Sequence, residues 1–287
     1  MRIGFSLPFR HKDGTAPTGR EVAAVAKAIE AAGFDGIWIA DAVARGGAIL
    51  PDPLAWLGVA AASTEQVELG TAILQLPVRA PVELAQRVLT LHALSNGRFR
   101  FGVGTGSNER DYKAAGADFS RRFSTLSEYA AIIRALCRGE QVGEARLVPW
   151  SNTLGGPPML VGSWVSPIWI RRAARDFDGW LTSGGGPSGN TFRNLKDGIK
   201  IYREAGGMRA MIATVQVDLT AESEPLSDET RLTLRCSPQE ALHRVKAAEA
   251  LGYDDLLLRK DDLVETDVLE VAALLGLKPR APAGAPA

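Results

Sequence analysis

Residues 98–109 read RFRFGVGTGSNE, and the position and spacing of the glycines in this stretch help to distinguish between two α/β folds. Its alternating apolar run breaks into glycines at Gly102, Gly104 and Gly106. A dinucleotide-binding Rossmann unit has Gly-x-Gly-x-x-Gly between its first strand and its first helix. Here Glu109 takes the place of the third glycine, and three strand-like segments come earlier in the chain. The stretch is therefore predicted to be a later strand and its exit turn.

On both sides of this stretch, short apolar runs alternate with longer segments of helical period, which is typical of parallel βα units. The clearest helix is expected from about Arg122 to Arg138, with an apolar stripe that includes Phe123. Three helix-to-strand junctions, AAGFDGIWI, ARDFDGWLT and ALGYDDLLL, resemble one another. The expected strands begin at Arg2, Gly36, Val67, Arg98, Pro158, Gly179, Met211 and Asp255. Eight such units predict a (β/α)8 TIM barrel as a single domain over residues 1–277, with an open doubly wound sheet as the alternative.

The composition indicates a protein whose partners are small molecules. The 33 basic and 33 acidic residues cancel, so no net field draws the chain toward nucleic acid or an anionic membrane. The two cysteines and three histidines lack the spacing of a disulfide framework or a metal site. Without a signal peptide pattern or an apolar run of about 18 residues, a cytoplasmic protein is expected. Residues 278–287, KPRAPAGAPA, are expected to be a disordered Pro/Ala tail.

Ligands of such barrels bind at the carboxyl ends of the strands, so the residues just after each strand are the candidates. Glycines at Gly104 and Gly106 would let the flat face of a ligand approach the backbone, or would simply make a tight exit turn. After the fifth strand, Gly162, Ser163 and Ser166 offer amides and hydroxyls to a phosphate at a helix N-terminus. A plain N-cap at Ser166 explains the same residues without a ligand.

Acid and base candidates are few. Asp41 ends the second strand and His11 lies in the first βα loop, with a loop cap as the alternative for Asp41 and an ordinary exposed histidine as the alternative for His11. A sugar isomerase or lyase would need a strand-end lysine, and Lys260 is the candidate. Because no nucleophile with its base and no carboxylate cluster can be assembled, an organic cofactor is expected to carry the chemistry.

Four segments together give the chain a family resemblance: 69–106, 119–136, 157–181 and 237–258. They include LGTAILQLPVRAPVELAQRVLTLHALSNGRFRFGVGTG and PPMLVGSWVSPIWIRRAARDFDGWL. With them the chain resembles the bacterial luciferase-like family of flavin- and deazaflavin-dependent oxidoreductases, from IGFSLP near the N-terminus to GYDDLLL near the C-terminus. The resemblance implies a (β/α)8 barrel, in agreement with the strand count.

The resemblance also implies roles for individual residues. The region Ala72, Ile73 and Leu74 matches a bulge after the third strand, which in many relatives contains a non-prolyl cis peptide that backs the isoalloxazine ring. Positions implied to line the ring are Thr105 and Gly106, and the positions implied to bind its phosphate are Gly162, Ser163 and Ser166.

Three departures from the family pattern bear on activity. Asp41 matches an acidic position that a histidine often follows, but Ala42 stands next in this chain, which leaves His11 as the substitute acid or base. The segment GSWVSP carries one residue more than the commoner spacing. Ser107 stands where the sugar-phosphate dehydrogenase branch has a carboxylate, which disfavours that activity.

The implied activity is monooxygenation of a small organic substrate with O2 and reduced FMN, the flavin being supplied by a separate flavin reductase. The alternatives are hydride transfer with the deazaflavin coenzyme F420 and a non-catalytic flavin-binding barrel. The resemblance further implies a homodimer formed through barrel helices.

Overall fold

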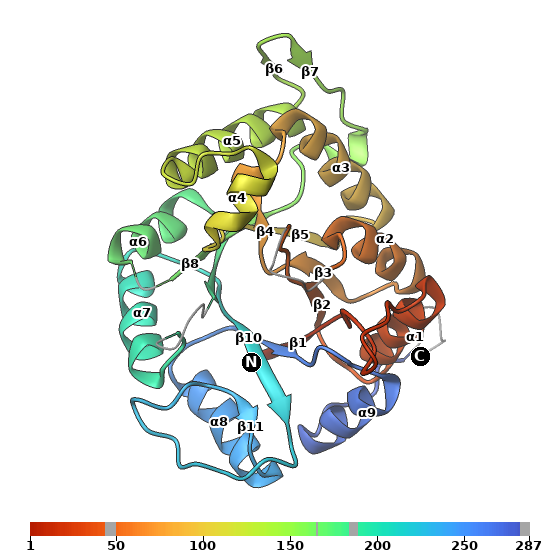
Figure 1. The fold of residues 1–287 in the computed structure, drawn as a ribbon, viewed down its shortest axis with the longest axis vertical. Helices are drawn as coiled ribbons and strands as arrows, with labels where there is room; N and C mark the ends of the chain where they lie inside the picture. The colour runs from red at the N-terminus through yellow and green to blue at the C-terminus, as the bar shows by residue number, and fades with distance from the viewer. Residues whose placement is uncertain (44–49, 165, 184–188, 282–287) are drawn as a thin grey trace.

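A computed structural model describes residues 1–43, 50–164, 166–183 and 189–281. Parallel strands pair in the order β1-β2-β3-β5-β8-β9-β10-β12, and β12 pairs back with β1, which closes a barrel (Figure 1). The strands are β1 (Arg2–Ser6), β2 (Gly36–Ile39), β3 (Glu68–Thr71), β5 (Phe99–Gly104), β8 (Met159–Ser163), β9 (Gly179–Ser183), β10 (Ala210–Asp218) and β12 (Asp255–Arg259). The predicted (β/α)8 barrel is confirmed, with each of the eight expected strands in place.

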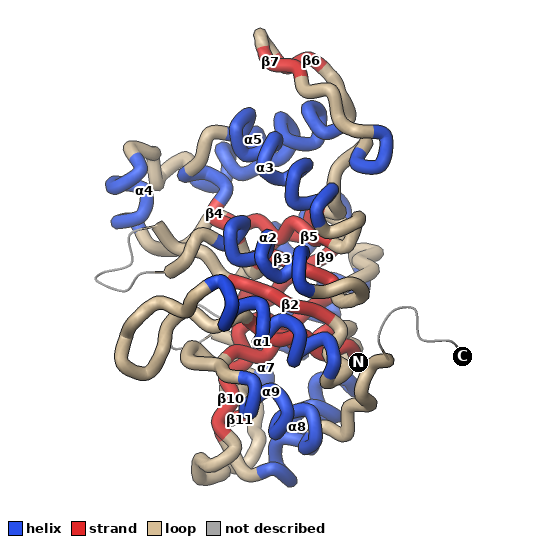
Figure 2. Tube along the Cα trace, turned by 90° about the vertical axis from the view of Figure 1, so that its right-hand side faces the viewer, coloured by secondary structure: helices blue, strands red, loops and turns tan. Residues whose placement is uncertain are grey.

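Helices surround the strands on the outside (Figure 2). They are α1 (Gly19–Ala31), α2 (Pro53–Ser63), α3 (Pro81–Leu94), α4 (Glu109–Ala115), α5 (Arg122–Cys137), α6 (Pro167–Asp176), α7 (Phe192–Glu204), α8 (Pro238–Ala250) and α9 (Glu265–Leu274). Short pieces complete the described chain: β4 (Leu74–Gln75), η1 (Leu76–Val78), β6 (Gln141–Val142), β7 (Ala145–Arg146), η2 (Ser151–Thr153) and β11 (Leu234–Arg235). A capping box forms at the start of α1, because Thr18 and Glu21 accept hydrogen bonds from each other's backbone N–H.

The largest side chain of the cluster inside the barrel is that of Trp38, which is 1% exposed. Glycines of three neighbouring strands make room for its indole: a Cβ added at Gly4, Gly36 or Gly70 would come within 2.7, 2.7 and 2.1 Å of the ring. Real Cβ atoms do not approach other atoms this closely, so the three glycines and the tryptophan specify one another. The rest of this inner cluster is Leu160, Leu181, Met211, Ala213 and Leu257, with Ala72 and Ile73 packed against it.

Below this layer, ion pairs close the amino-terminal end of the barrel. Glu68 receives hydrogen bonds from Arg100 at 2.8 Å and from Arg209 at 2.7 Å, and it also pairs with Arg2. Arg209 reaches Asp255 as well, at 2.8 Å. Burial raises the pKa of Glu68, but hydrogen bonds and charge from Arg209 and the neighbouring arginines outweigh it, so the pKa lies below its ordinary value.

A pH dependence of stability follows from Glu68. Because its pKa is lower in the folded chain than in the unfolded chain, its contribution is fully present above about pH 4.5 and is lost as the pH falls through the folded pKa. We expect the urea concentration at the midpoint of unfolding to decrease as the pH is lowered below about 4.5. In Glu68→Gln this decrease should be less steep. The exposed Glu144 serves as the control, and an unchanged pH profile in Glu68→Gln combined with a changed one in Glu144→Gln would contradict the assignment.

Part of the expected tail lies within the described residues. The Arg280 backbone N–H donates to Ala31 O at 3.0 Å, and Gln66 Nε2 donates to Ala281 O at 3.1 Å. The chain up to Ala281 therefore packs beside α1, and the prediction of disorder concerns residues 282–287, which lie outside the described residues. In the described part of the chain, no helix combines the length and the apolar character that crossing a membrane requires.

Candidate active site

A cavity of about 510 Å³ opens at the carboxyl ends of β5 and β8, on the face of the barrel turned toward the viewer in Figure 1. The starts of α5 and α6 form its outer wall. Its described lining residues are Ile73, Gly104, Thr105, Gly106, Ser107, Phe119, Arg122, Phe123, Leu126, Gly162, Ser163, Trp164, Ser166, Ile168 and Trp169. The structure thus brings together the predicted ring-side residues after β5 and the predicted phosphate-side residues after β8.

The floor of the cavity is the bulge between β3 and β4. The peptide bond between Ala72 and Ile73 is cis, as the family resemblance implies for this region. Ile73 lies between the barrel interior below and the cavity above. Leu74 is buried and pairs with Val103 of β5, so of the three predicted bulge residues Ile73 is the one that lines the cavity.

The bulge also explains the glycines of residues 98–109. A Cβ at Gly102 would lie 1.9 Å from Thr71 O, and a Cβ at Gly104 would lie 2.9 Å from the Ile73 side chain. Gly106 has a φ of +69°, and a Cβ there would lie 2.8 Å from Gln75. The bulge of the neighbouring strand therefore requires all three glycines. Gly104 and Gly106 line the cavity in addition, so the approach of a flat ligand to these glycines stays a prediction.

The Asp41 side chain makes its hydrogen bonds next to the same bulge. Both of its carboxylate oxygens bind Arg79, at 2.7 and 2.8 Å, and Oδ2 also accepts the Gln75 backbone N–H at 2.9 Å. The Asp41 side chain is 3% exposed. Gln75 Nε2 in turn donates to the buried Asp111 of α4 at 2.8 Å. Asp41 is absent from the described cavity lining and lies in a polar network that holds the bulge and the loop after β5 together.

His11 lies in a different place. It lines a separate pocket of about 330 Å³ between the first βα loop, α1 and the start of α9. Its Nε2 lies 3.6 Å from a carboxylate oxygen of Glu21. Neither His11 nor Asp41 is among the described residues that line the larger cavity, and an acid–base role for either residue stays a prediction.

At the phosphate side, the three predicted residues differ. Ser166 precedes α6 without forming a side-chain cap, so its hydroxyl and the first amides of the helix are available to a ligand. Ser163 Oγ instead accepts a hydrogen bond from the buried Trp180 indole at 3.0 Å. Gly162 lines the cavity. A Cβ at this position would lie 2.6 Å from the Ile73 side chain, so the contact with Ile73 requires a glycine here.

Arg122 is the residue that the sequence analysis missed. It is the charged side chain among the described lining residues. Arg122 Nη1 donates to Phe119 O at 3.0 Å, and its other N–H groups have no protein partner within the described chain. A signal was present in the sequence, because a cation at the first position of a helix opposes the helix dipole and suggests another role.

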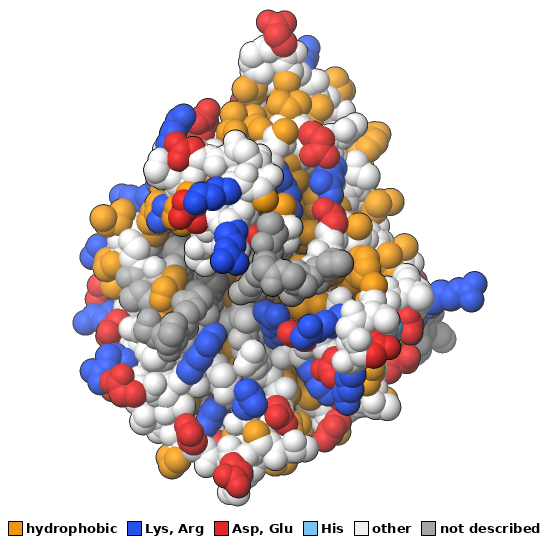
Figure 3. All heavy atoms as spheres, viewed as in Figure 1, with side chains coloured by type: hydrophobic (Ala, Val, Ile, Leu, Met, Phe, Trp, Pro, Cys, Tyr) orange, Lys and Arg blue, Asp and Glu red, His pale blue; other side chains and the backbone are white. Residues whose placement is uncertain are grey.

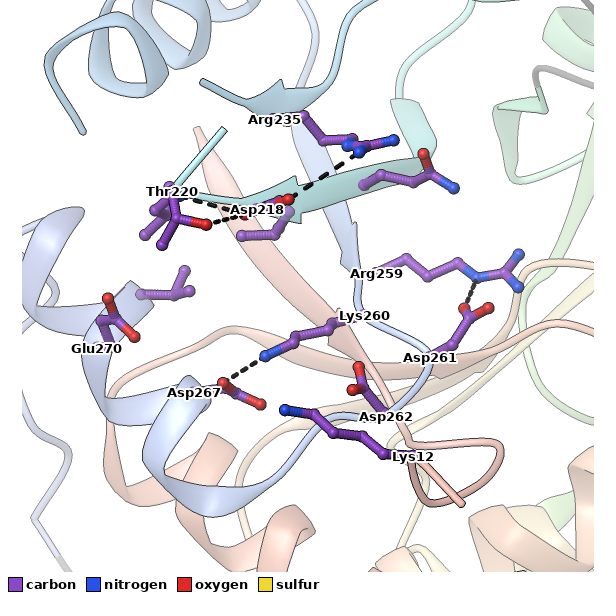
Figure 4. Close-up of a pocket in the computed structure, with 14 residues that line it drawn as sticks. Lys12, Asp218, Thr220, Arg235, Arg259, Lys260, Asp261, Asp262, Asp267 and Glu270 are labelled. Atoms are coloured by element: carbon purple, nitrogen blue, oxygen red, sulfur yellow. Dashed lines mark hydrogen bonds and ion pairs between the residues drawn. The ribbon is translucent and has the colours of Figure 1, made fainter. Parts of the chain in front are cut away.

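A third, strongly charged pocket of about 500 Å³ lies at the ends of β10 and β12 beside α9 (Figure 4). Lys260 points toward Asp267 and binds it, and Arg259 donates to Asp261 at 2.6 Å. A lyase or isomerase lysine has to be free to react. The ion pair of Lys260 therefore weighs against that alternative. Over the same face of the molecule, basic and acidic side chains are intermixed (Figure 3).

The fold and the cavity define a closed (β/α)8 barrel with a ligand-sized cavity at the carboxyl ends of its strands. Residues 1–231 match the family model described as luciferase-like monooxygenase, and the chain belongs to that family. Within the described residues, no group of three or more His, Cys, Asp or Glu side chains is arranged to hold a metal ion.

Two curated relatives illustrate the range of the family. The chain is similar to an "F420-dependent glucose-6-phosphate dehydrogenase" of Nakamurella multipartita, with 34% identity over 197 residues, covering 63% of this chain and 58% of the relative. It is also similar to a "4-hydroxyprotoasukamycin monooxygenase" of Streptomyces nodosus subsp. asukaensis, with 29% identity over 153 residues, covering 50% of this chain and 41% of the relative. The chain thus matches only part of the length of these relatives.

Solved structures show the same fold over nearly the whole chain. The monooxygenase RslO1 from Streptomyces bottropensis superposes with a TM-score of 0.77 at 18% identity, covering 96% of this chain and 97% of that one. The coenzyme F420-dependent tetrahydromethanopterin reductase from Methanopyrus kandleri gives a TM-score of 0.74 at 15% identity, covering 96% and 99%. At such identities the comparison supports the barrel and not a particular substrate.

Proposed function

We propose that this chain is a flavin-dependent oxidoreductase that monooxygenates a small organic substrate with O2 and a reduced flavin nucleotide, FMN being the form predicted from the resemblance. The observation that carries the proposal is the cavity that runs from the glycine-lined floor at Ile73 to Arg122 and Ser166. A flat ring fits against the floor because the neighbouring positions have no Cβ. A phosphate fits the far end because a guanidinium and a helix N-terminus meet there.

The chemistry of the cavity wall favours a flavin over the deazaflavin coenzyme, whose longer polar tail would need cationic or polar partners. Beyond Arg122, the described outer wall is apolar and aromatic, with Phe119, Phe123, Ile168 and Trp169. Hydride transfer with F420 stays the alternative, and the name of the Nakamurella relative supports it. The non-catalytic barrel stays the third possibility, because Asp41 is committed to Arg79 and Ala42 replaces the usual histidine.

A bound reduced flavin supplies the electrons that oxygen requires, and the residues of this chain bind it and exclude water. Ile73 supports the ring from below, and the aromatic wall keeps the cavity apolar. The contacts of Asp41 support a positioning role, since its oxygens hold Arg79 and the Gln75 amide. A separate reductase, a homodimer and a cytoplasmic location belong to the same proposal. Exposed apolar side chains at Leu94 and Leu154 are consistent with the dimer.

The proposal is tested by equilibrium titration of the purified chain with FMN and with F420, each oxidised and reduced, followed by absorbance or fluorescence. We expect preferential binding of reduced FMN. Arg122→Leu removes a charge-assisted hydrogen bond to the phosphate and is expected to weaken FMN binding about 10- to 100-fold. Arg121→Leu, at the exposed neighbouring position, is the control and should bind as the wild type does. Binding of F420 alone would favour hydride transfer, and unchanged binding in Arg122→Leu would reject the phosphate site.

A further inference from the structure

The side chains inside the barrel form layers, and the layer at the carboxyl ends of the strands contains a cation. Along β12, Asp255 lies in the ion-pair layer and Leu257 in the inner cluster. Leu256 and Leu258, which alternate with them, pack in the larger hydrophobic core outside the strands. Because alternate residues of a strand share a face, Arg259 lies on the inner side, above Leu257. Arg259 therefore extends from the last position of β12 into the mouth of the barrel.

A bulge in the neighbouring strand places an amide beside this cation. The register between β10 and β12 shifts between Ile212 and Val215, so β10 carries one extra residue there. Within this bulge Thr214 has a φ of +63°, which is rare for a β-branched residue and is found mostly near functional sites. An extra residue exchanges the faces of the strand that follows it. Gln216 therefore takes the inner side, pairs in register with Arg259 and lines the same charged pocket.

The Arg259 guanidinium is held by two contacts that leave one edge available. Its Nε donates to Asp261 at 2.6 Å, and its plane lies over the Phe9 ring, 4.7 Å from the ring centre. In Figure 4 the guanidinium points away from the ion pair of Lys260 and Asp267. Within the described residues, neither Nη nitrogen has an acceptor. The two Nη groups thus form a fixed pair of parallel N–H donors, which we name the Arg259 fork.

The Arg259 fork lies across the barrel from the proposed ring floor. Three strands separate β12 from β5 in both directions around the closed sheet, so the two strands are opposite each other. At the floor, Gly104 of β5 and Gly162 of β8 have no side chains of their own. The interior of an eight-stranded barrel is only wide enough for side chains from opposite strands to meet. A substrate that lies over the open face of the ring is therefore expected to meet Arg259 and Gln216.

We propose that the Arg259 fork binds a carboxylate of the substrate, and that the substrate is a small organic acid. This proposal rests on the proposed function and names its substrate class. Two parallel N–H donors match the two oxygens of a carboxylate, and the Gln216 amide donates to the same group. Asp261 balances part of the charge of Arg259, and the described pocket lining contains four basic and five acidic side chains. A group with one negative charge therefore fits better than a phosphate dianion.

The test compares benzoate with benzamide, which has nearly the same shape but no charge. The FMN-loaded protein is titrated with each compound, and binding is followed by flavin absorbance and by calorimetry. We expect benzoate to bind about 10- to 100-fold more tightly, as a charge-assisted hydrogen bond provides. Arg259→Leu should lower benzoate affinity to that of benzamide and leave the affinities for benzamide and FMN unchanged. Arg259→Lys keeps the charge without the fork and should restore only part of the preference.

Arg235→Leu is the matched control. Arg235 lines the same pocket, but its side chain is 58% exposed and its nearest carboxylate, on Asp218, lies 4.0 Å away. Benzoate affinity in this variant should equal that of the wild type. Because Asp261 is itself partly exposed, with 42% of its side chain accessible, Arg259→Leu leaves no buried charge and is expected to fold. Thermal unfolding of each variant checks this.

Three outcomes would overturn the carboxylate site and leave the flavin function intact: equal affinities for benzoate and benzamide in the wild type, no binding of either compound, or a benzoate preference that Arg259→Leu retains. Inorganic phosphate that binds more tightly than benzoate would assign the fork to a phosphate and overturn the proposal as well. Calorimetry without flavin separates the two proposals. A benzoate preference that depends on Arg259, in a protein that binds no FMN, would support the carboxylate site and reject the flavin function.

Discussion

Replacement of Trp38 by alanine is expected to lower the free energy of unfolding by about 3–5 kcal/mol, as for other large aromatic residues removed from a core. The indole fills the barrel interior, and Gly4, Gly36 and Gly70 offer no side chain that could move into the space it leaves. The space left by the indole would lie below Ile73, so the floor of the proposed flavin site is expected to lose its support as well. Urea denaturation at neutral pH measures the first effect, and flavin titration measures the second.

Trp150→Ala removes the same side chain from a position that is 58% exposed, and it provides the control. We expect its unfolding free energy to stay within about 0.5 kcal/mol of the wild type. Equal losses in the two variants would mean that the contacts of Trp38 do not dominate the interior. A stable Trp38→Ala protein that binds flavin normally would show that the floor at Ile73 does not depend on the inner cluster.

Replacement of Asp41 by alanine has the second large effect. The Arg79 guanidinium, whose side chain is only 15% exposed, loses the carboxylate that it pairs with. The Gln75 backbone N–H loses its acceptor. Removing one member of a buried ion pair costs about 3–5 kcal/mol. Because Gln75 packs against Gly106, weaker flavin binding is expected to accompany the loss of stability.

A double-mutant cycle with Arg79→Leu separates the two roles considered for Asp41. If Asp41 positions the bulge, the double variant should recover part of the stability lost in Asp41→Ala, because no charge is then left unpaired. Asp41→Asn keeps the shape of the side chain. If Asp41→Asn kept both stability and flavin affinity but abolished turnover, Asp41 would be the acid or base and the positioning role would be wrong.

The sequence predicted the architecture well for a local reason. Each βα unit carries its own signals, such as the capping box at Thr18 and the turn glycines Gly33 and Gly252, which have φ values of +93° and +96°. Counting eight such units led to the barrel, which the strand pairing confirms. The segment that starts at Val67 differs, because the expected single strand is divided into β3 and β4 around the cis peptide.

The candidate site was predicted in part. The strand-end rule pointed to Gly104, Thr105 and Gly106, and the structure places all three on the cavity. Periodicity assigned Phe123 to the core, although the helix turns that position toward the cavity instead. The apolar stripe runs along the whole of α5, so its periodicity does not show which turns pack on the sheet. The first turn, which contains Phe123, extends beyond the sheet to the cavity.

The sequence by itself determined the order and type of the elements, because caps, glycine ends and apolar periods act within a few residues. Only the tertiary structure decided what the glycines of 98–109 accommodate, which partner holds Asp41 and where Arg122 lies. These depend on Thr71, Arg79 and other residues that are distant in the chain, and closure of the barrel brings them together. Such contacts follow from how strands and helices meet in space, which no local pattern of residues records.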